Sequence, residues 1–330
     1  MSLIELLIVM SILAILAGTA FVMLGRTGEE ARKAATLTTL RKLDSLLQAR
    51  FDELRKNFDE QEKKKLRTSD WINIQNTADN HPLLTSLPMQ TRLAVVRADR
   101  YRGTFPQREE DLFGIDDDEF GAVPDNSPLL TIWRNFNPGP KTDRNLESSE
   151  LLYLALTTGV SSGAGKEILE DISPRHIQDK DGNGLPEIYD DWGNPLRFYN
   201  APTRLVRPGG LAAPTPTPAQ HALTAALIAS VPPTPTGAPT DPGYFAQAFN
   251  QDPFDSRGAL RTQAVFDAEA MFRTPSTFFR PMIVSCGADE QLGLHEPTEA
   301  DFNRLGVLSA GADAMSEAAD NLTNLQRVGG

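Results

Sequence analysis

One uncharged stretch near the N-terminus constrains the fold of this chain more than any other feature. Residues 6–24 contain no Asp, Glu, Lys or Arg and are nearly all apolar. An apolar run of this length is just sufficient to cross a bilayer as a helix. No Lys or Arg precedes the run, and Gly18, Thr19 and Ala20 make a poor cleavage site, so a secretory signal peptide is not expected. The sequence predicts a membrane segment.

Glu5 is the one charged residue before that stretch. A carboxylate placed in lipid costs at least about 2.5 kcal/mol unless a cation neutralises it. A plain single-span anchor does not account for this cost. We therefore expect Glu5 to have a cationic partner.

The apolar stretch continues into an amphipathic one without a helix-breaking signal. Apolar residues recur at steps of three and four, namely Leu37, Leu40, Leu43, Leu47, Phe51, Leu54 and Phe58, with charged residues between them. The first proline is Pro82. The pattern predicts a single helix from residue 3 to about 65, roughly 90 Å long and weakened at Gly18, Gly25 and Gly28.

The charge of the chain is unevenly distributed. The net charge is −12, yet the first 70 residues hold 12 basic and 10 acidic side chains, and the rest hold 20 and 34. An acidic body repels phosphate backbones, so no nucleic-acid partner is expected, whereas divalent cations become plausible ligands. The single cysteine, Cys286, excludes an internal disulfide, and with four scattered histidines it excludes a zinc site of usual spacing.

Residues 2–9, Ser-Leu-Ile-Glu-Leu-Leu-Ile-Val, resemble the mature N-terminus of type IV pilins and of the pseudopilins of type II secretion. The resemblance implies that a prepilin peptidase removes a leader before residue 1 and that the N-terminus is methylated. It also implies that Glu5 pairs with the free amine of Met1 of a neighbouring subunit during filament assembly. The chain departs from the family at Met1, where phenylalanine is usual, and at Val22, where proline is common.

Two distant segments carry a second resemblance. Residues 191–199 and 283–293 resemble segments that major pseudopilins fold into a small C-terminal antiparallel sheet packed on the long helix. The residues agree with this, because a Gly-Asn-Pro turn precedes the alternating Leu196 and Phe198, and residues 278–284 read as a second strand. We expect an α+β fold in which a long N-terminal helix, half membrane-compatible and half amphipathic, carries a head with this sheet.

The chain divides into four parts on these grounds. Residues 1–25 are expected to form the transmembrane or filament-core helix, 26–66 its amphipathic continuation, 67–190 a helical and loop-rich part of the head, and 191–330 the sheet region. Helices are predicted at 91–101, 147–158, 220–230 and 260–272, with Ser148 or Ser149 as a cap. Otherwise residues 57–145 are expected to be irregular, and their acidic run at 116–119 to be solvated.

An insertion at about residues 200–277 separates the two sheet segments. Nine of the 24 prolines lie between residues 201 and 240, which favours extended polyproline-like spacers. Such spacers present threonine hydroxyls without competing structure. O-glycosylation is therefore a hypothesis for Thr215, Thr217, Thr234 and Thr236.

Residues 179–190 resemble an EF-hand or dockerin-type calcium loop. Oxygen-bearing side chains alternate, and a glycine occupies loop position 6. The resemblance implies calcium ligands from Asp179, Asp181, Asn183, the Leu185 carbonyl and Asp190, with Glu187 acting through water or replacing Asp190. An ordinary turn is the alternative. A second candidate metal loop, Asp289, Glu290, Glu296 and Asp301, lies where major pseudopilins bind calcium, although Gln291 and Leu292 interrupt the family's glycine-rich pattern.

Signals for catalysis are weak. Residues 159–163 fit a nucleophile-elbow pattern around Ser161 but follow a predicted helix, and the segment before Lys166 lacks the first glycine of a phosphate loop. His81, His176, His221 and His295 are not at ligand spacing and are expected on the surface or in loops. No enzyme activity is expected.

The expected function is therefore structural. The chain is expected to be the subunit of a type IV pilus-like homopolymer, held in the inner membrane with its assembly machinery and then displayed on the cell surface. A periplasmic pseudopilus subunit of type II secretion is the alternative. A membrane-anchored hydrolase or binding protein is a remote one.

Overall fold

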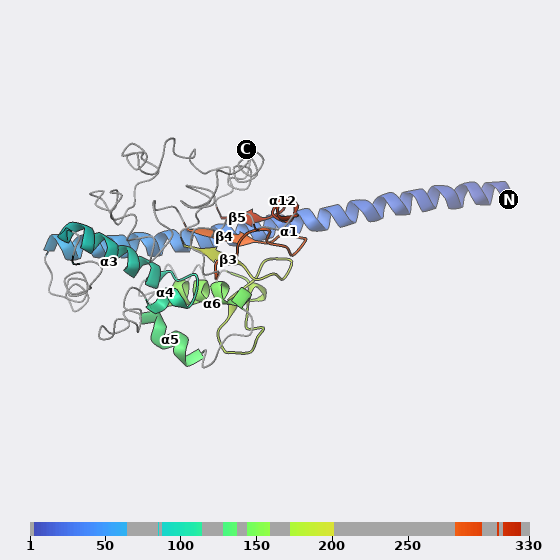
Figure 1. Ribbon diagram of the computed structural model, residues 1–330. Coiled ribbons are helices and arrows are strands. Elements are labelled where there is room, and N and C mark those ends of the chain that lie inside the picture. The colour runs from blue at the N-terminus through green and yellow to red at the C-terminus, as the bar shows by residue number, and fades with distance from the viewer. Residues whose placement is uncertain are drawn as a thin grey trace, which may run out of the picture.

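The computed structural model describes residues 3–64, 85, 88–113, 128–136, 144–158, 172–200, 281–298, 309 and 313–324. These residues form an α+β protein with one long N-terminal helix, shorter helices and two small antiparallel sheets, as expected (Figure 1). The helices are α1 (Leu3–Lys64), α3 (Met89–Thr104), α4 (Glu110–Phe113), α5 (Pro128–Phe136), α6 (Arg144–Thr157), the 3₁₀ helix η2 (Pro174–His176) and α12 (Ala314–Glu317). The strands are β1 (Ile177–Gln178), β2 (Glu187–Ile188), β3 (Arg197–Tyr199), β4 (Met282–Ser285) and β5 (Leu322–Thr323).

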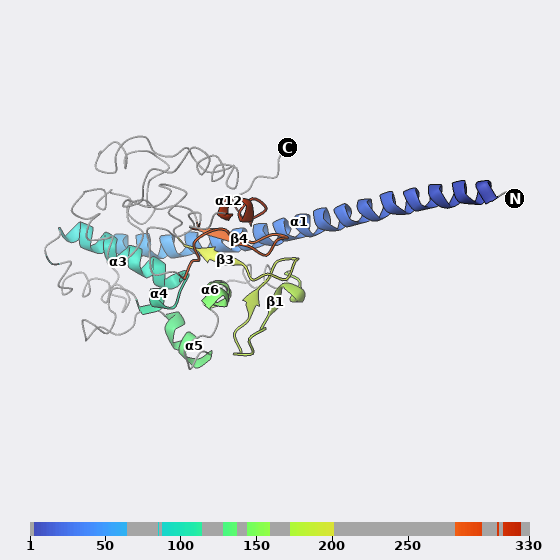
Figure 2. The same ribbon diagram turned by 45° about the vertical axis from the view of Figure 1, so that its right-hand side comes forward.

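Helix α1 runs unbroken for 62 residues, which confirms the predicted continuous helix. Its C-terminal half passes through the head, and its N-terminal half projects away from it (Figures 1 and 2). The apolar face predicted from the spacing is the face that packs. Five of its residues are buried, Leu40, Leu43, Leu47, Phe51 and Phe58, and the other two, Leu37 and Leu54, are partly buried.

A three-stranded antiparallel sheet lies against α1 in the order β3-β4-β5. Phe198 of β3 pairs with Ile283 of β4, so the two segments that resemble the major pseudopilin sheet are neighbours despite the long insertion between them. The second strand is described from Met282, and residues 278–280 lie outside the described part of the chain. Strand β5, which was not predicted from the sequence, pairs with β4 and contacts α1.

Helix α6 packs on β2 and β3. The predicted helix at 147–158 is confirmed, but the predicted serine cap is wrong because α6 begins earlier, at Arg144. Both serine hydroxyls instead form hydrogen bonds with backbone groups of the strands. The Ser149 hydroxyl donates to the Ile188 carbonyl at 3.0 Å and accepts from the Ile188 N–H at 2.8 Å, and the Ser148 hydroxyl accepts from the Phe198 N–H at 3.3 Å. These bonds dock α6 on the edges of both sheets.

Two helices lie in the region expected to be irregular. Helix α5 starts at a proline, which suits a first helical position, and buries Leu129, Leu130 and Trp133. Helix α4 is a single turn that contacts α3 and α5. The expectation was wrong there, whereas the predicted helix at 91–101 is confirmed by α3. The predicted helices at 220–230 and 260–272, the acidic run at 116–119 and the four candidate glycosylation threonines lie outside the described residues.

Candidate functional site

The projecting half of α1 is the first candidate site. Its described side chains at positions 8, 10–17 and 27–34 are all exposed. Six large apolar side chains, Ile8, Met10, Ile12, Leu13, Ile15 and Leu16, are each between 52% and 67% exposed. Glu5 belongs to the same helix, and Met1 lies outside the described residues. Across the part of the chain that the structure describes, no helix combines the length and the apolar character needed to cross a membrane.

The head forms hydrogen bonds with α1 near the end of the exposed half. The buried Thr36 hydroxyl accepts a hydrogen bond from the Asp191 N–H at 3.1 Å and donates to the Asp191 carboxylate at 3.4 Å. The Trp192 indole N–H donates to the Glu29 carboxylate at 2.8 Å. Arg175, which belongs to η2, forms an ion pair with the Asp191 carboxylate. The loop after β2 therefore fixes the point at which the helix leaves the head.

The predicted calcium loop is the second candidate site, and it connects β1 to β2. Asp179 shapes the loop, because its carboxylate accepts from the Gly182 N–H at 2.7 Å and from the Gly184 N–H at 2.9 Å. Both glycines have left-handed backbones, with φ of 76° and 90°. A Cβ at Gly184 would lie 3.3 Å from the ring of Phe136, so this turn also packs against α5.

Three carboxyl groups meet at this loop. One ligand oxygen from each of Glu150, Asp181 and Glu187 lies within 4.8 Å of the other two. Glu150 and Glu187 are buried, and Asp181 is exposed. Burial raises the pKa of the Glu187 carboxyl above its ordinary value, and the nearby charge of Asp181 raises this pKa further. We refer to Glu150, Asp181 and Glu187 as the acidic cluster.

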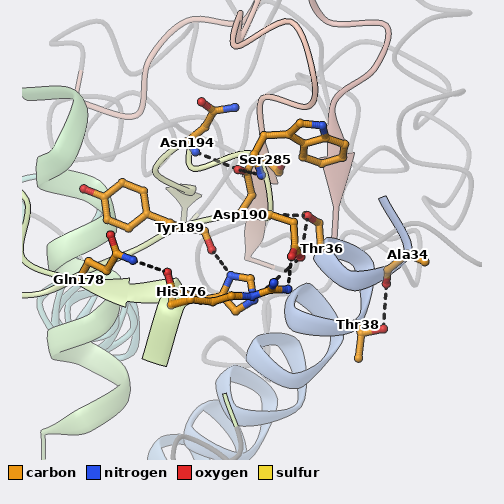
Figure 3. Close-up of polar contacts among 12 residues, drawn as sticks. Ala34, Thr36, Thr38, His176, Gln178, Tyr189, Asp190, Asn194 and Ser285 are labelled. Atoms are coloured by element: carbon orange, nitrogen blue, oxygen red, sulfur yellow. Dashed lines mark hydrogen bonds and ion pairs between the residues drawn. The ribbon is translucent and has the colours of Figure 1, made fainter. Parts of the chain in front are cut away.

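The acidic cluster differs from the predicted ligand set at two positions. Glu150, which is not among the ligands predicted from the sequence, comes from α6 and joins Asp181 and Glu187. Asp190, the predicted last ligand, is buried with its carboxylate directed elsewhere. It accepts from the Asn194 N–H at 2.8 Å and from the Ser285 hydroxyl at 2.6 Å (Figure 3). Of the two roles expected for Glu187, its place in the cluster suits replacement of Asp190.

The remaining predicted ligands of the loop lie close to the cluster. The Asn183 side-chain amide donates to Glu150 at 2.6 Å and to Asp181 at 3.0 Å, and its oxygen accepts from the Leu185 N–H at 2.7 Å. Leu185 is buried. In this arrangement the neutral Asn183 amide bridges two carboxylates.

The second predicted metal loop is not assembled in the same way. Glu296 forms an ion pair with Arg197, with a nitrogen-to-oxygen distance of 2.6 Å. The Asp289 carboxylate accepts from the Gln291 N–H at 2.9 Å, and Glu290 has a left-handed backbone with φ of 64°. Asp301 lies outside the described residues. The described residues therefore do not bring the four predicted ligands together.

The structure describes only some of the residues in the weak catalytic motifs and among the four histidines. Ser161, Lys166, His81 and His221 lie outside the described residues. The expectation of a surface or loop position is wrong for His176, which is buried in η2 with its ring Nδ1 3.0 Å from the Tyr189 carbonyl oxygen.

Comparison of the chain with protein-family models, with curated proteins and with solved structures found no match.

Proposed function

We propose that the chain is a structural subunit of a type IV pilus-like helical filament, held in the inner membrane before assembly and displayed at the cell surface afterwards. The observation that carries the proposal is the unequal use of α1. One half supplies core residues to the head, and the other half exposes large apolar side chains along a projecting helix. Exposed apolar surface of this kind stabilises a protein only when another apolar phase covers it.

Two apolar phases suit the projecting half at different stages. A bilayer suits the uncharged run of residues 6–24 before assembly. In a filament, the same halves of neighbouring subunits pack together and leave the acidic heads outside. The resemblance of residues 2–9 to pilin N-termini supports this proposal independently of the geometry.

Glu5 has a defined role in this proposal. Its carboxylate pairs with a cation of the neighbouring subunit, for which the N-terminal amine is the family's candidate. Removing one partner of a buried ion pair typically costs about 3–5 kcal/mol, because the other charge stays buried and uncompensated. The pair would therefore select correct insertion of each new subunit.

A test of this proposal replaces Glu5 in cells that assemble the filament. We expect Glu5→Ala and Glu5→Gln to leave the protein in the membrane fraction and to abolish filaments seen by electron microscopy. Glu30→Ala, which removes an exposed carboxylate from the same helix outside the uncharged run, is the matched control and should assemble normally. Normal filament yield from both Glu5 variants would refute the proposal.

A pseudopilus subunit of type II secretion is the second candidate function. The pairing of β3 with β4 favours it, because the two segments that resemble major pseudopilins are adjacent strands of one sheet on α1. Immunogold labelling of intact cells separates the two candidates. Labelled surface filaments support the pilus, and labelling only after the outer membrane is opened supports the pseudopilus.

A further inference from the structure

The acidic cluster joins side chains from two separate elements, α6 and the β1–β2 loop. Two of its three members, Glu150 and Glu187, are fully buried. Ionised carboxylates that are buried near one another repel, and each also loses its hydration. Such an arrangement is stable at neutral pH when positive charge lies between the groups.

Glu187 supplies a second and independent observation. Its Oε2 atom accepts from the Lys180 N–H at 3.1 Å and from the Tyr189 hydroxyl at 3.2 Å. Its Oε1 atom is buried and has no hydrogen-bond donor among the described residues. Buried carboxylate oxygens are nearly always satisfied, so an orphaned one is a place where a water molecule or a bound ion supplies the missing contact.

The basic side chain within the loop, Lys180, contacts residues outside the acidic cluster. Lys180 is the only basic residue between positions 179 and 190. Its ammonium group lies 3.6 Å from the centre of the Tyr189 ring and donates to the Gly193 carbonyl at 2.9 Å. These two contacts hold the ammonium group at the Gly193 turn.

We propose that the acidic cluster is a calcium site, with Glu150, Asp181 and Glu187 as the carboxylate ligands. An all-oxygen donor set on a surface loop suits calcium, which accepts six to eight oxygen ligands in flexible geometry. The ion also couples two parts of the head, because Glu150 belongs to the helix that packs on both sheets. This site is independent of the proposed filament function, and either proposal can fail without the other.

The test uses the full-length chain in mild detergent, with calcium chloride as the probe. In wild type, about 10 mM calcium should raise the melting temperature by about 2–5 °C relative to chelator, as expected for a site that binds near millimolar. Asp181→Asn changes an exposed side chain and should remove most of this rise. Calorimetric titration should show calcium affinity weakened at least about tenfold in this variant.

Two further variants make the test specific. Glu187→Gln should behave like Asp181→Asn, and circular dichroism in chelator reports whether it folds. Asp289→Asn, in the other predicted metal loop, should keep the full wild-type response. The proposal is overturned if calcium does not stabilise wild type, if Asp181→Asn keeps the rise, or if Asp289→Asn is the variant that loses it.

Discussion

At the scale of single residues, Asp190 ties the turn after β2 to strand β4. Its Oδ1 atom accepts from the Trp192 N–H at 2.9 Å and from the Asn194 N–H at 2.8 Å. Its Oδ2 atom accepts from the Ser285 hydroxyl at 2.6 Å. Asp190 is buried, and removal of its carboxylate would take the acceptor away from the buried Ser285 hydroxyl and from two half-buried N–H groups.

We therefore predict different costs for two substitutions at this position. Asp190→Ala orphans three donors and should lower the free energy of unfolding by about 2–4 kcal/mol. Asp190→Asn keeps an acceptor for the two N–H groups, and the Ser285 hydroxyl can turn to accept from the new amide, so the cost at pH 7 should stay below about 1.5 kcal/mol. Urea denaturation of both variants measures the difference, and equal costs would contradict the assigned hydrogen bonds.

A second prediction concerns pH. Burial raises the pKa of the Asp190 carboxyl above its ordinary value of 3.8, although hydrogen bonds from Ser285, Asn194 and Trp192 oppose the shift. The folded state therefore holds this proton more tightly than the unfolded state. The resulting stability is fully present below pH 3.8 and is lost as the pH rises through the raised pKa.

The Asp190→Asn variant has no titrating group at this position. A comparison of wild type with this variant therefore isolates the contribution of the Asp190 proton to stability. The difference in unfolding free energy between wild type and Asp190→Asn should be largest below pH 3.8 and should shrink as the pH rises toward 7. Urea denaturation at several pH values measures it. A difference that grows with pH would mean that the folded-state pKa is lowered instead.

The candidate site shows which residue-scale features the sequence could predict. Asp181 and Glu187 were predictable because alternating oxygens and glycines follow a local rule for metal loops. Glu150 was not, because its neighbours form an apolar helix pattern and only the packing of α6 on β2 brings it to the loop. Asp190 satisfied the spacing rule, yet the strand pairing that places Ser285 beside it was not visible locally.

At the scale of secondary-structure elements, Thr36 links α1 to the head. Its hydroxyl is buried and exchanges hydrogen bonds with Asp191. The hydroxyl of the exposed Thr38, by contrast, donates to the Ala34 carbonyl of its own helix (Figure 3). Thr36→Val keeps the side-chain shape, buries no hydroxyl and removes the acceptor of the half-buried Asp191 N–H, so it should cost about 1–3 kcal/mol.

Thr38→Val is the matched control for Thr36→Val. It removes a hydroxyl from an exposed position of the same helix and should change the unfolding free energy by no more than about 0.5 kcal/mol. Chemical denaturation of both variants gives the comparison. Similar costs for the two substitutions would show that the contact between Thr36 and Asp191 does not hold the helix to the head.

The elements themselves differed in how well the sequence predicted them. The seven apolar residues of α1 recur over six turns, so their signal is strong and the helix was predictable almost to its end. Helix α4 and strand β5 have four and two residues, which is too short for any periodicity to develop. Those elements depend on tertiary contacts, which α3 and α5 provide for α4, and β4 and α1 provide for β5.

At the scale of the whole molecule, α1 divides into two environments. Beyond Thr36 its large apolar side chains are buried or partly buried by the head, whereas its described side chains from position 8 to 34 are exposed. Stability and assembly should therefore respond to different parts of one helix. A substitution in the uncharged run of residues 6–24 should alter contacts between molecules and leave the folding of the head unchanged.

Ile12→Glu tests this separation directly. Ile12 is 52% exposed and lies in the uncharged run, so a carboxylate there removes no contact with the head. In a bilayer the new charge costs about 2.5–3.5 kcal/mol, and in a filament core it is buried without a partner in every subunit. We predict that Ile12→Glu keeps the melting temperature of the head and abolishes filaments in electron micrographs. Ala31→Glu, at an exposed position beyond the run, should keep both properties, and loss of assembly in both variants would implicate helix charge in general instead of the apolar surface.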